Sequence, residues 1–387
     1  MLSWFMLNID KNKLKIDNNL SLYLHIPFCL SKCHYCDFFS QPNISINQQQ
    51  IFASKVLRHI DSFFNYLDIN KLSTLYIGGG TPSILPEDSL FSILQLIKKY
   101  SPLEATIEVN PQQVNPSLLN FLFDNGVTRI SMGLQSLDEE ALKIVNRPTT
   151  YEQMMNALNL LAAYRQKVNI DIIAGLSNRQ KFNETINKLL EINPSHISFY
   201  SLTIEEDTPL FNKQRLLPNV QEQEHQWFLG RKKLIKAGYH NYEISNYAKN
   251  NCYSRHNLAY WQGKSYLGVG AGAASTLYYN DATAIRLVGT EDLTDWFNEE
   301  DITKLYISEE LTKKELIFES FMLSLRTSVG LDKAKFKERF GQDSETYLGS
   351  LSPKALSCLS SNEKYIKVNH KGKLFLNNLL HELKEII

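Results

Sequence analysis

The stretch LHIPFCLSKCHYCDFF, residues 24–39, holds three of the chain's five cysteines within eight residues. Cys29, Cys33 and Cys36 have the spacing C-x3-C-x2-C, in a polar loop that follows a short apolar segment. A structural zinc ion normally takes four protein ligands, and no fourth Cys or His follows at the usual spacing. Three thiolates instead suit a [4Fe-4S] cluster that leaves one iron open to a small molecule. These three residues, here called the cluster-loop cysteines, are therefore the predicted cluster ligands.

The composition of the chain is that of an ordinary globular protein. Its 387 residues suffice for one large domain and a smaller one. Lys plus Arg and Asp plus Glu number 41 each, and this zero balance predicts no nucleic-acid partner. No apolar run approaches the ~18 residues of a spanning helix, and the first residues lack the basic region of a secretory signal. Clustered cysteines without a disulfide framework favour a reducing, cytoplasmic location.

A regular alternation of short apolar segments and helical patterns runs from residue 20 to residue 205. The predicted strands are short and rich in β-branched or aromatic residues. They cover residues 21–26, 74–78, 105–110, 129–135, 169–175 and 196–202. Six strand–helix units in series predict an α/β fold, a partial (βα)6 barrel of the TIM type. The cluster-loop cysteines follow the first strand, so they lie at the face where such barrels collect their chemistry.

The alternation of strand and helix patterns ends after residue 215, which suggests that the chain is divided into several parts. We expect an N-terminal extension over residues 1–19, a barrel core over 20–215, a connecting segment over 216–300 and a C-terminal domain over 301–387. The last part reads as helical from residue 308, followed by a hairpin over residues 364–376 and a final amphipathic helix. This pattern predicts a small, mostly helical, winged-helix-like domain. Packing is its favoured role, because the neutral charge disfavours DNA binding.

Polar residues and glycines recur at the ends of successive predicted strands. The motifs are GGGTP at 78–82, IEVNP at 107–111, GLQS at 133–136, VNRP at 145–148 and IDIIAG at 170–175. Each motif alone is equally well explained by a turn or by a solvated side chain. Their recurrence at one end of a barrel, however, is what a ligand site at the barrel mouth requires.

Together with the cysteine spacing, these motifs resemble the radical S-adenosylmethionine (SAM) superfamily. The resemblance implies that the open iron takes the amino and carboxylate groups of SAM. An electron from the cluster can then cleave the sulfonium to a 5′-deoxyadenosyl radical. The resemblance places SAM contacts on Tyr23, Tyr35, Gly79, Gly80, Thr81, Glu108, Gln135, Arg147 and Asp171.

The motifs YLHIPFC, GGGTP, EVNP, RISMGLQS and IDIIAGL resemble one subfamily in particular, over nearly the whole chain. That subfamily contains oxygen-independent coproporphyrinogen III dehydrogenase and a related heme chaperone. The dehydrogenase branch has a further cysteine two residues after the third ligand, where this chain has Phe38. It also has a longer N-terminal region, whereas only 28 residues precede Cys29 here. Both differences favour the chaperone branch.

The segment SRHNLAYW, residues 254–261, resembles the HNxxYW signature of the chaperone branch. The resemblance implies that His256 binds heme, and a neutral imidazole is a good axial ligand of heme iron. The residue types alone favour another interpretation, in which His256 caps a turn and Tyr260 and Trp261 belong to the core. Some relatives have a cysteine two residues before this histidine, where Ser254 stands here, so a thiolate contribution to heme binding is not expected.

Two functions follow from these resemblances. The favoured one is a carrier that holds a [4Fe-4S] cluster and SAM, binds heme and passes it to acceptor proteins. The alternative is an enzyme that oxidatively decarboxylates coproporphyrinogen propionates by radical chemistry. A third, radical modification of RNA, is disfavoured by the zero net charge. The sequence leaves open whether SAM is cleaved, whether heme binds covalently, whether the chain forms a homodimer and whether it touches a membrane transiently.

Overall fold

The structure is a computed structural model that describes residues 7–14 and 20–387, and its centre is one 12-stranded sheet. The remaining residues of the expected N-terminal extension lie outside the described ones. In order across the sheet, the strands are β14 (Tyr306–Leu311), β13 (Ala284–Gly289), β12 (Ala274–Tyr278), β11 (Tyr266–Val269), β1 (Leu20–Ile26), β4 (Leu72–Gly79), β5 (Glu104–Val109), β6 (Arg129–Gln135), β7 (Val168–Ala174), β8 (His196–Ser201), β10 (Asn246–Ala248) and β9 (His240–Asn241).

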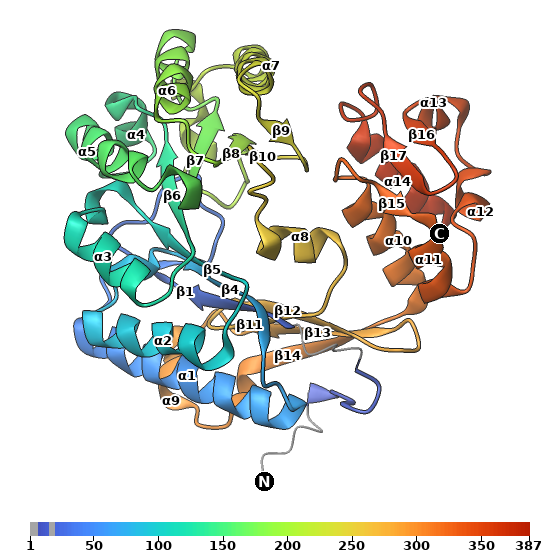
Figure 1. Ribbon diagram of the computed structural model, residues 1–387, viewed down its shortest axis with the longest axis horizontal. Helices are drawn as coiled ribbons and strands as arrows, with labels where there is room; N and C mark the ends of the chain where they lie inside the picture. Colours follow the sequence, from blue (N-terminus) through green and yellow to red (C-terminus); the bar gives the residue numbers. More distant parts are fainter. Residues whose placement is uncertain (1–6, 15–19) are drawn as a thin grey trace.

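The strands from β1 to β8 pair in parallel and form the wall of a partial barrel (Figure 1). This confirms the predicted series of six strand–helix units, with bounds that differ by at most two residues. The helices that cover the outer face are α1 (Ile46–Leu67), α2 (Glu87–Tyr100), α3 (Pro116–Asp124), α4 (Glu139–Ile144), α5 (Tyr151–Ala162), α6 (Arg179–Ile192) and α7 (Val220–Lys236). Apolar residues of the strands and of these helices form the main core between the two layers.

Local signals in the sequence set where these helices begin. The Thr150 side chain accepts from the backbone of Gln153, whose own side chain accepts from the Thr150 backbone, so α5 opens with a capping box. Asn115 caps α3, in which Pro116 takes the first position and needs no backbone donor. Because each helix starts at a fixed residue after its strand, the loops at the strand ends have defined lengths and positions.

Residues 216–300 contribute strands to the same sheet and do more than connect its two ends. β11 pairs in parallel with β1, β12 and β13 continue outward in antiparallel pairs, and β14, which follows this segment in the chain, pairs with β13. At the opposite edge, β10 and β9 add antiparallel strands beside β8. Two helices belong to this part, α8 (Arg255–Trp261) and α9 (Leu293–Asn298). The Gly/Ala-rich run is a close turn between β11 and β12, where a Cβ on Gly268 would lie 2.1 Å from the Ala274 carbonyl oxygen.

The C-terminal domain has its own apolar core and a three-stranded sheet. Its helices are α10 (Lys313–Ser324), α11 (Lys333–Phe340), α12 (Glu345–Leu348), α13 (Pro353–Leu356) and α14 (Leu376–Ile386), and its strands are β15 (Leu331–Asp332), β16 (Leu359–Ser361) and β17 (Tyr365–Val368). The mostly helical character is confirmed, but the hairpin predicted over residues 364–376 is wrong in its position along the chain. The observed hairpin pairs β16 with β17, and residues 369–375 form the turn that leads to α14.

The helix expected from residue 308 also begins later than predicted. Residues 306–311 form β14, because they pair along the whole of β13. Thr312 then caps α10 through a capping box with Glu315, and this local signal marks the true start.

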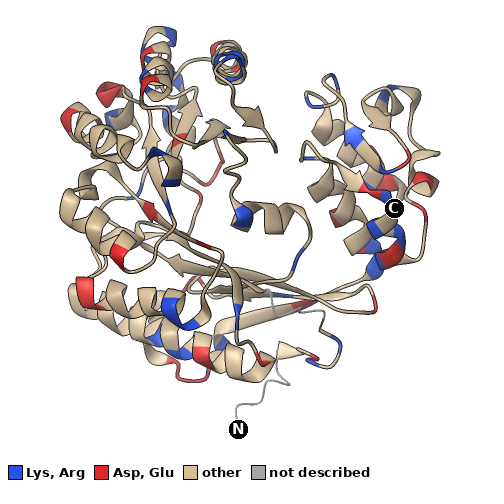
Figure 2. Ribbon diagram, viewed as in Figure 1, with Lys and Arg blue, Asp and Glu red and all other residues tan. Residues whose placement is uncertain are grey.

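Charged residues of both signs are interspersed over the outer helices and the C-terminal domain (Figure 2). Surface ion pairs such as Lys143 with Glu140 and Lys181 with Glu184 join neighbouring turns of one helix. Within the described ranges, no helix combines the length and the apolar character that crossing a membrane requires.

Candidate cofactor site at the barrel mouth

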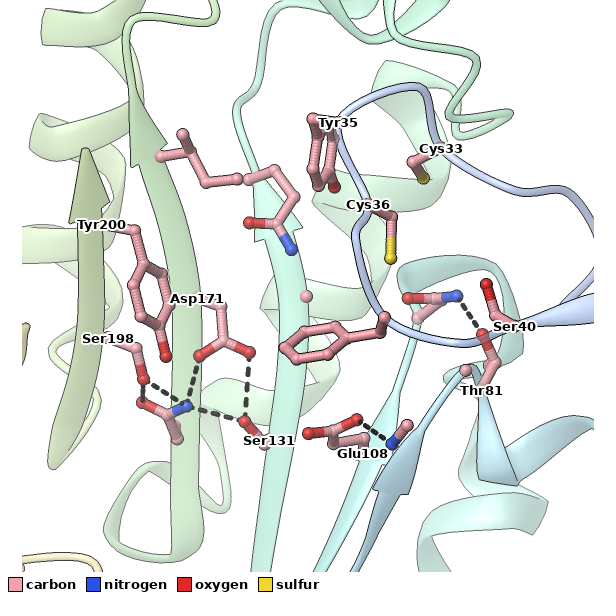
Figure 3. Close-up of a pocket in the computed structure, with 18 of the residues that line it drawn as sticks. Cys33, Tyr35, Cys36, Ser40, Thr81, Glu108, Ser131, Asp171, Ser198 and Tyr200 are labelled. Atoms are coloured by element: carbon pink, nitrogen blue, oxygen red, sulfur yellow. Dashed lines mark hydrogen bonds between the residues drawn. The ribbon is translucent and has the colours of Figure 1, made fainter. Parts of the chain in front are cut away.

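The cluster loop leaves the barrel between two short strands, β2 (Phe28–Cys29) and β3 (Gln41–Pro42), which pair with each other. The His34 N–H donates to the Val145 carbonyl (2.8 Å), and the Asn146 side chain donates to the Lys32 carbonyl (2.9 Å). These contacts tie the loop to the segment that precedes Arg147. The loop is therefore held over the mouth of the barrel, where all three cluster-loop cysteines line one cavity. Figure 3 shows Cys33 and Cys36 on this loop.

The cluster-loop cysteines are arranged differently from the ligands of a single ion. Among the residues that the structure describes, no three His, Cys, Asp or Glu side chains converge as one metal ion would require. A cluster makes no such demand, because each thiolate binds a different iron. The surroundings also suit a group beside the loop, since a Cβ on Gly80 would lie 2.9 Å from Cys29 Sγ and 2.5 Å from the Phe28 carbonyl oxygen. The donor set and the bare backbone therefore fit a three-cysteine cluster.

The glycine loop after β4 is joined to Glu108 at the end of β5. The Gly79 N–H donates to Glu108 Oε2 (3.1 Å), and the Tyr76 hydroxyl donates to Oε1 (2.7 Å). Gly79 has φ +109, a conformation in which a side chain would be strained and would also strike the His25 ring. Burial raises the pKa of Glu108 to about 7, against the opposing effect of its two donors. This carboxyl group is thus partly protonated near neutral pH and can both donate and accept hydrogen bonds.

Gln135 and Arg147 supply polar groups on the β6 side of the mouth. Arg147 Nη2 donates to Asn110 Oδ1 (2.8 Å) and to the Gly133 carbonyl, and Nη1 lies 3.6 Å from Cys33 Sγ. Two buried atoms have no partner here, Arg147 Nε and Gln135 Oε1. Buried polar atoms are nearly always hydrogen-bonded, so unpaired ones beside a cavity mark the place of a missing ligand. The cavity holds about 450 Å³, within the range of small-molecule sites.

Asp171 on β7 lies deeper and is held by a network of side chains (Figure 3). Ser131 Oγ donates to its Oδ2 (3.1 Å), and Asn169 Nδ2 donates to its Oδ1 (2.7 Å). Burial raises the pKa of Asp171 above its ordinary value, while the hydrogen bonds of Ser198, Asn169 and Ser131 act in the opposite direction. The network fixes the carboxylate toward the cavity, where a ligand hydroxyl or amine can reach it.

The structure brings most of the predicted SAM residues together. The cavity is lined by Tyr35, Gly79, Gly80, Thr81, Glu108, Gln135, Arg147 and Asp171. Tyr23 is not among the described lining residues, because its hydroxyl is bonded to His25 Nδ1 (2.8 Å) and its ring lies against Tyr76. Sequence reasoning missed Asn110, which bridges Arg147 and the Thr81 hydroxyl. Its position directly after β5, within EVNP, was the available signal.

His256 lies at the other end of the barrel, on α8. It is 1% exposed, its Nδ1 is hydrogen-bonded to Thr74 Oγ1 (2.7 Å) and its Nε2 to the Tyr260 hydroxyl (2.8 Å). Burial lowers the pKa of His256 to about 3, which keeps the imidazole neutral at physiological pH. Both ring nitrogens are thus paired within the protein, as in the core interpretation of this residue.

The similarity of this chain to known proteins shows the family to which it belongs. The model of the Radical SAM superfamily matches residues 23–189, and that of the HemN C-terminal domain matches residues 311–375. Heme chaperone HemW from Buchnera aphidicola (subsp. Acyrthosiphon pisum) is 32% identical over 371 residues, which cover 93% of this chain and 97% of that protein. Heme chaperone HemW from Escherichia coli K12 is 32% identical over 376 residues, with the same coverage.

A solved structure matches the fold. Coproporphyrinogen III oxidase (HemN) from Escherichia coli, described as a radical SAM enzyme, is similar with a TM-score of 0.80 and 23% identity. The match covers 95% of this chain and 91% of that one. It confirms the predicted α/β architecture with its helical C-terminal domain. From the full-length similarity at 32% identity, the chain belongs to the HemW family of the radical SAM superfamily.

Proposed function

We propose that this protein is a heme chaperone, which binds heme and passes it to acceptor proteins. The observation that carries the proposal is the similarity to proteins named heme chaperone HemW along 93% of the chain. Phe38, at the position where the dehydrogenase branch has a fourth cysteine, also supports it. The acceptor proteins are unidentified, and the cytoplasmic location, the homodimer and the transient membrane contact stay predictions.

Membership of the radical SAM superfamily implies a [4Fe-4S] cluster and SAM. We propose the cluster-loop cysteines as the ligands of the cluster. When bound, the cluster supplies an electron for reductive chemistry on the SAM sulfonium. The residues of this chain have the task of holding SAM in place: the glycine loop and Glu108 from one side, Arg147 and Gln135 from the other. The unpaired Gln135 Oε1 and Arg147 Nε are the atoms that a bound SAM would satisfy.

The heme ligand remains a proposal, and His256 is the candidate. Its imidazole is neutral, as an iron ligand must be. In this structure, however, ligation through Nε2 requires the Tyr260 hydroxyl to give up its hydrogen bond. Heme binding by His256 therefore involves a local movement of the α8 residues, and its affinity includes the free energy of that movement.

A second candidate function, oxidative decarboxylation of coproporphyrinogen, is compatible with the predicted SAM residues that line the cavity. In that case the cavity at the mouth would also have to admit a porphyrinogen propionate beside SAM. Both functions predict the same cluster and the same SAM contacts, so these features do not distinguish them. Stable heme binding and porphyrinogen turnover do.

The test is anaerobic reconstitution with iron and sulfide, followed by titration with heme and by a coproporphyrinogen turnover assay on the same sample. Transfer is measured by adding apomyoglobin, an unrelated heme acceptor, and recording the myoglobin spectrum. Stoichiometric heme binding, transfer and absence of turnover support the chaperone. Turnover without stable heme binding would overturn it and favour the dehydrogenase.

A further inference from the structure

The cavity at the barrel mouth continues down the interior of the barrel to α8. Along β6, alternate residues face inward, and Arg129, Ser131, Gly133 and Gln135 all line the cavity. At ~3.3 Å per residue, the four steps from Arg129 to Gly133 span about 13 Å along β6. Ser254, at the start of α8, lines the same cavity. Barrels of this type are usually filled by layers of branched apolar side chains, so a polar interior of this depth calls for an explanation.

Arg129 is a buried cation that makes no direct ion pair with any described residue. It is 7% exposed, its Nη1 donates to the Cys252 carbonyl (3.3 Å), and its buried Nη2 has no hydrogen-bond partner. In the described part of the chain, no carboxylate oxygen lies within 4.0 Å of its guanidinium. Burying a charge is costly unless it is paired, so a guanidinium with no direct ion pair and one unpaired nitrogen can take an anionic partner at close range.

Thr106 provides a second unpaired group, on the strand next to that of Arg129. In the register of β5 and β6 it is the direct partner of Arg129, on the neighbouring strand. Both residues line the cavity, and the Thr106 hydroxyl is buried without a hydrogen-bond partner. A guanidinium fork and a hydroxyl that line the same cavity are groups that bind carboxylates.

The charged groups nearby already have partners. Asp171 accepts from Ser131 and Asn169. Glu104 accepts from the N–H groups of Arg255 and His256 at the start of α8, each at 3.0 Å. His196, the nearby imidazole, is bonded through both ring nitrogens, to Asn169 and Tyr242. These bonds come from neutral donors and leave the charge of Asp171 in place, so this carboxyl attracts Arg129 electrostatically, although no ion pair joins the two among the described residues.

We propose that the lower end of the barrel interior, between Arg129 and Thr106, binds the carboxylate of a small monoanionic molecule. The site lies in the same cavity as the proposed SAM contacts, below Asp171, which is level with Gly133 in the sheet register. A single guanidinium with Asp171 in the next layer favours one negative charge over two, so a monocarboxylate fits better than a phosphate dianion. The inference does not depend on the heme-chaperone function.

The test measures thermal unfolding of the full-length, reconstituted protein at saturating SAM, titrated with sodium propionate at constant ionic strength set by sodium chloride. Propionate should raise the unfolding temperature relative to chloride, because it binds the folded state. Arg129→Met should raise the propionate midpoint at least tenfold, and Arg129→Lys should restore part of the effect. Arg58→Met, which removes an exposed arginine of α1, is the matched control and should leave the midpoint unchanged.

Several results would overturn the proposal. They are an effect of propionate equal to that of chloride, an unchanged midpoint in Arg129→Met, a greater effect of phosphate than of propionate, and a midpoint that rises in proportion to added SAM. Should Arg129→Met fail to fold, Thr106→Val decides the question. A severalfold higher midpoint in this variant supports the site, and an unchanged midpoint contradicts it.

Discussion

The role of His256 can be tested by changing its neighbour Tyr260 and leaving the histidine in place. Tyr260→Phe keeps the ring that packs edge-on against the imidazole and against Tyr266, and removes only the hydroxyl bonded to Nε2. If heme iron takes Nε2, the hydroxyl competes with heme in the wild-type protein. The substitution then tightens heme binding, because the competing hydrogen bond no longer has to be broken.

The expected size follows from the geometry of the pair. The bond is short, 2.8 Å, and buried, and a buried hydrogen bond contributes about 0.5–1.5 kcal/mol net, with about 1–3 kcal/mol lost when one partner is left unpaired. Tyr260→Phe should therefore destabilise the heme-free protein by about 1–3 kcal/mol. The heme complex is spared this loss, because Nε2 is then occupied by iron. Heme affinity should rise by about tenfold, which corresponds to about 1.4 kcal/mol.

The assay is heme titration followed by absorption, with urea unfolding of the heme-free protein in parallel. His256→Ala should lose most of the affinity, and His240→Ala, on an exposed histidine of β9, is the control that should change neither quantity. An unchanged heme affinity in Tyr260→Phe, together with the expected loss of stability, would refute ligation through Nε2. His256 would then be a core residue, as its hydrogen bonds alone indicate.

Three further predictions concern the mouth of the barrel. Alanine at any cluster-loop cysteine should abolish the visible iron–sulfur absorption after reconstitution, whereas Cys252→Ala should retain it. Asp171→Ala should weaken SAM binding in equilibrium dialysis about tenfold, by the loss of about 1.4 kcal/mol, with unchanged iron content. The folded pKa of Glu108, about 7, lies above the ordinary 4.5, so the wild type loses stability as pH rises from 4.5 through 7. Glu108→Gln should therefore be more stable at pH 8, by at most about 3 kcal/mol in urea unfolding, and the gain should vanish near pH 4.

The barrel strands could be predicted because parallel strands covered on both faces read as nearly continuous apolar runs. The outer strands could not be predicted in this way. In β13, Val288 is 41% exposed while its neighbour Leu287 is fully buried, so only one face carries an apolar signal. The position of β11 depends on pairing with β1, more than two hundred residues earlier in the chain. No local pattern contains that information.

The site residues also differ in this respect: some are indicated by local motifs, and others depend on contacts between distant parts of the chain. Motifs at strand ends indicated most of the residues at the mouth, because parallel strands bring their ends together. The state of His256 was not predictable, since one of its partners, Thr74, is 182 positions away in the sequence. Arg129 lies inside the motif RISMGLQS that supported the family resemblance, but only the structure places it at the bottom of the cavity.

Residues of β6 face the helices and the cavity alternately, and this arrangement bears on how SAM and heme reach their sites. Its outward residues Ile130, Met132 and Leu134 are fully buried against the helices, and its inward residues line the cavity. The interior is therefore a polar space of about 450 Å³. His256 meets the Tyr260 hydroxyl through Nε2, the ring nitrogen that does not contact Thr74. If His256 binds heme, the heme approaches from the side of Tyr260, and SAM from the barrel mouth. Saturating SAM should then leave the heme affinity unchanged, and direct competition between the two in titration would contradict this separation.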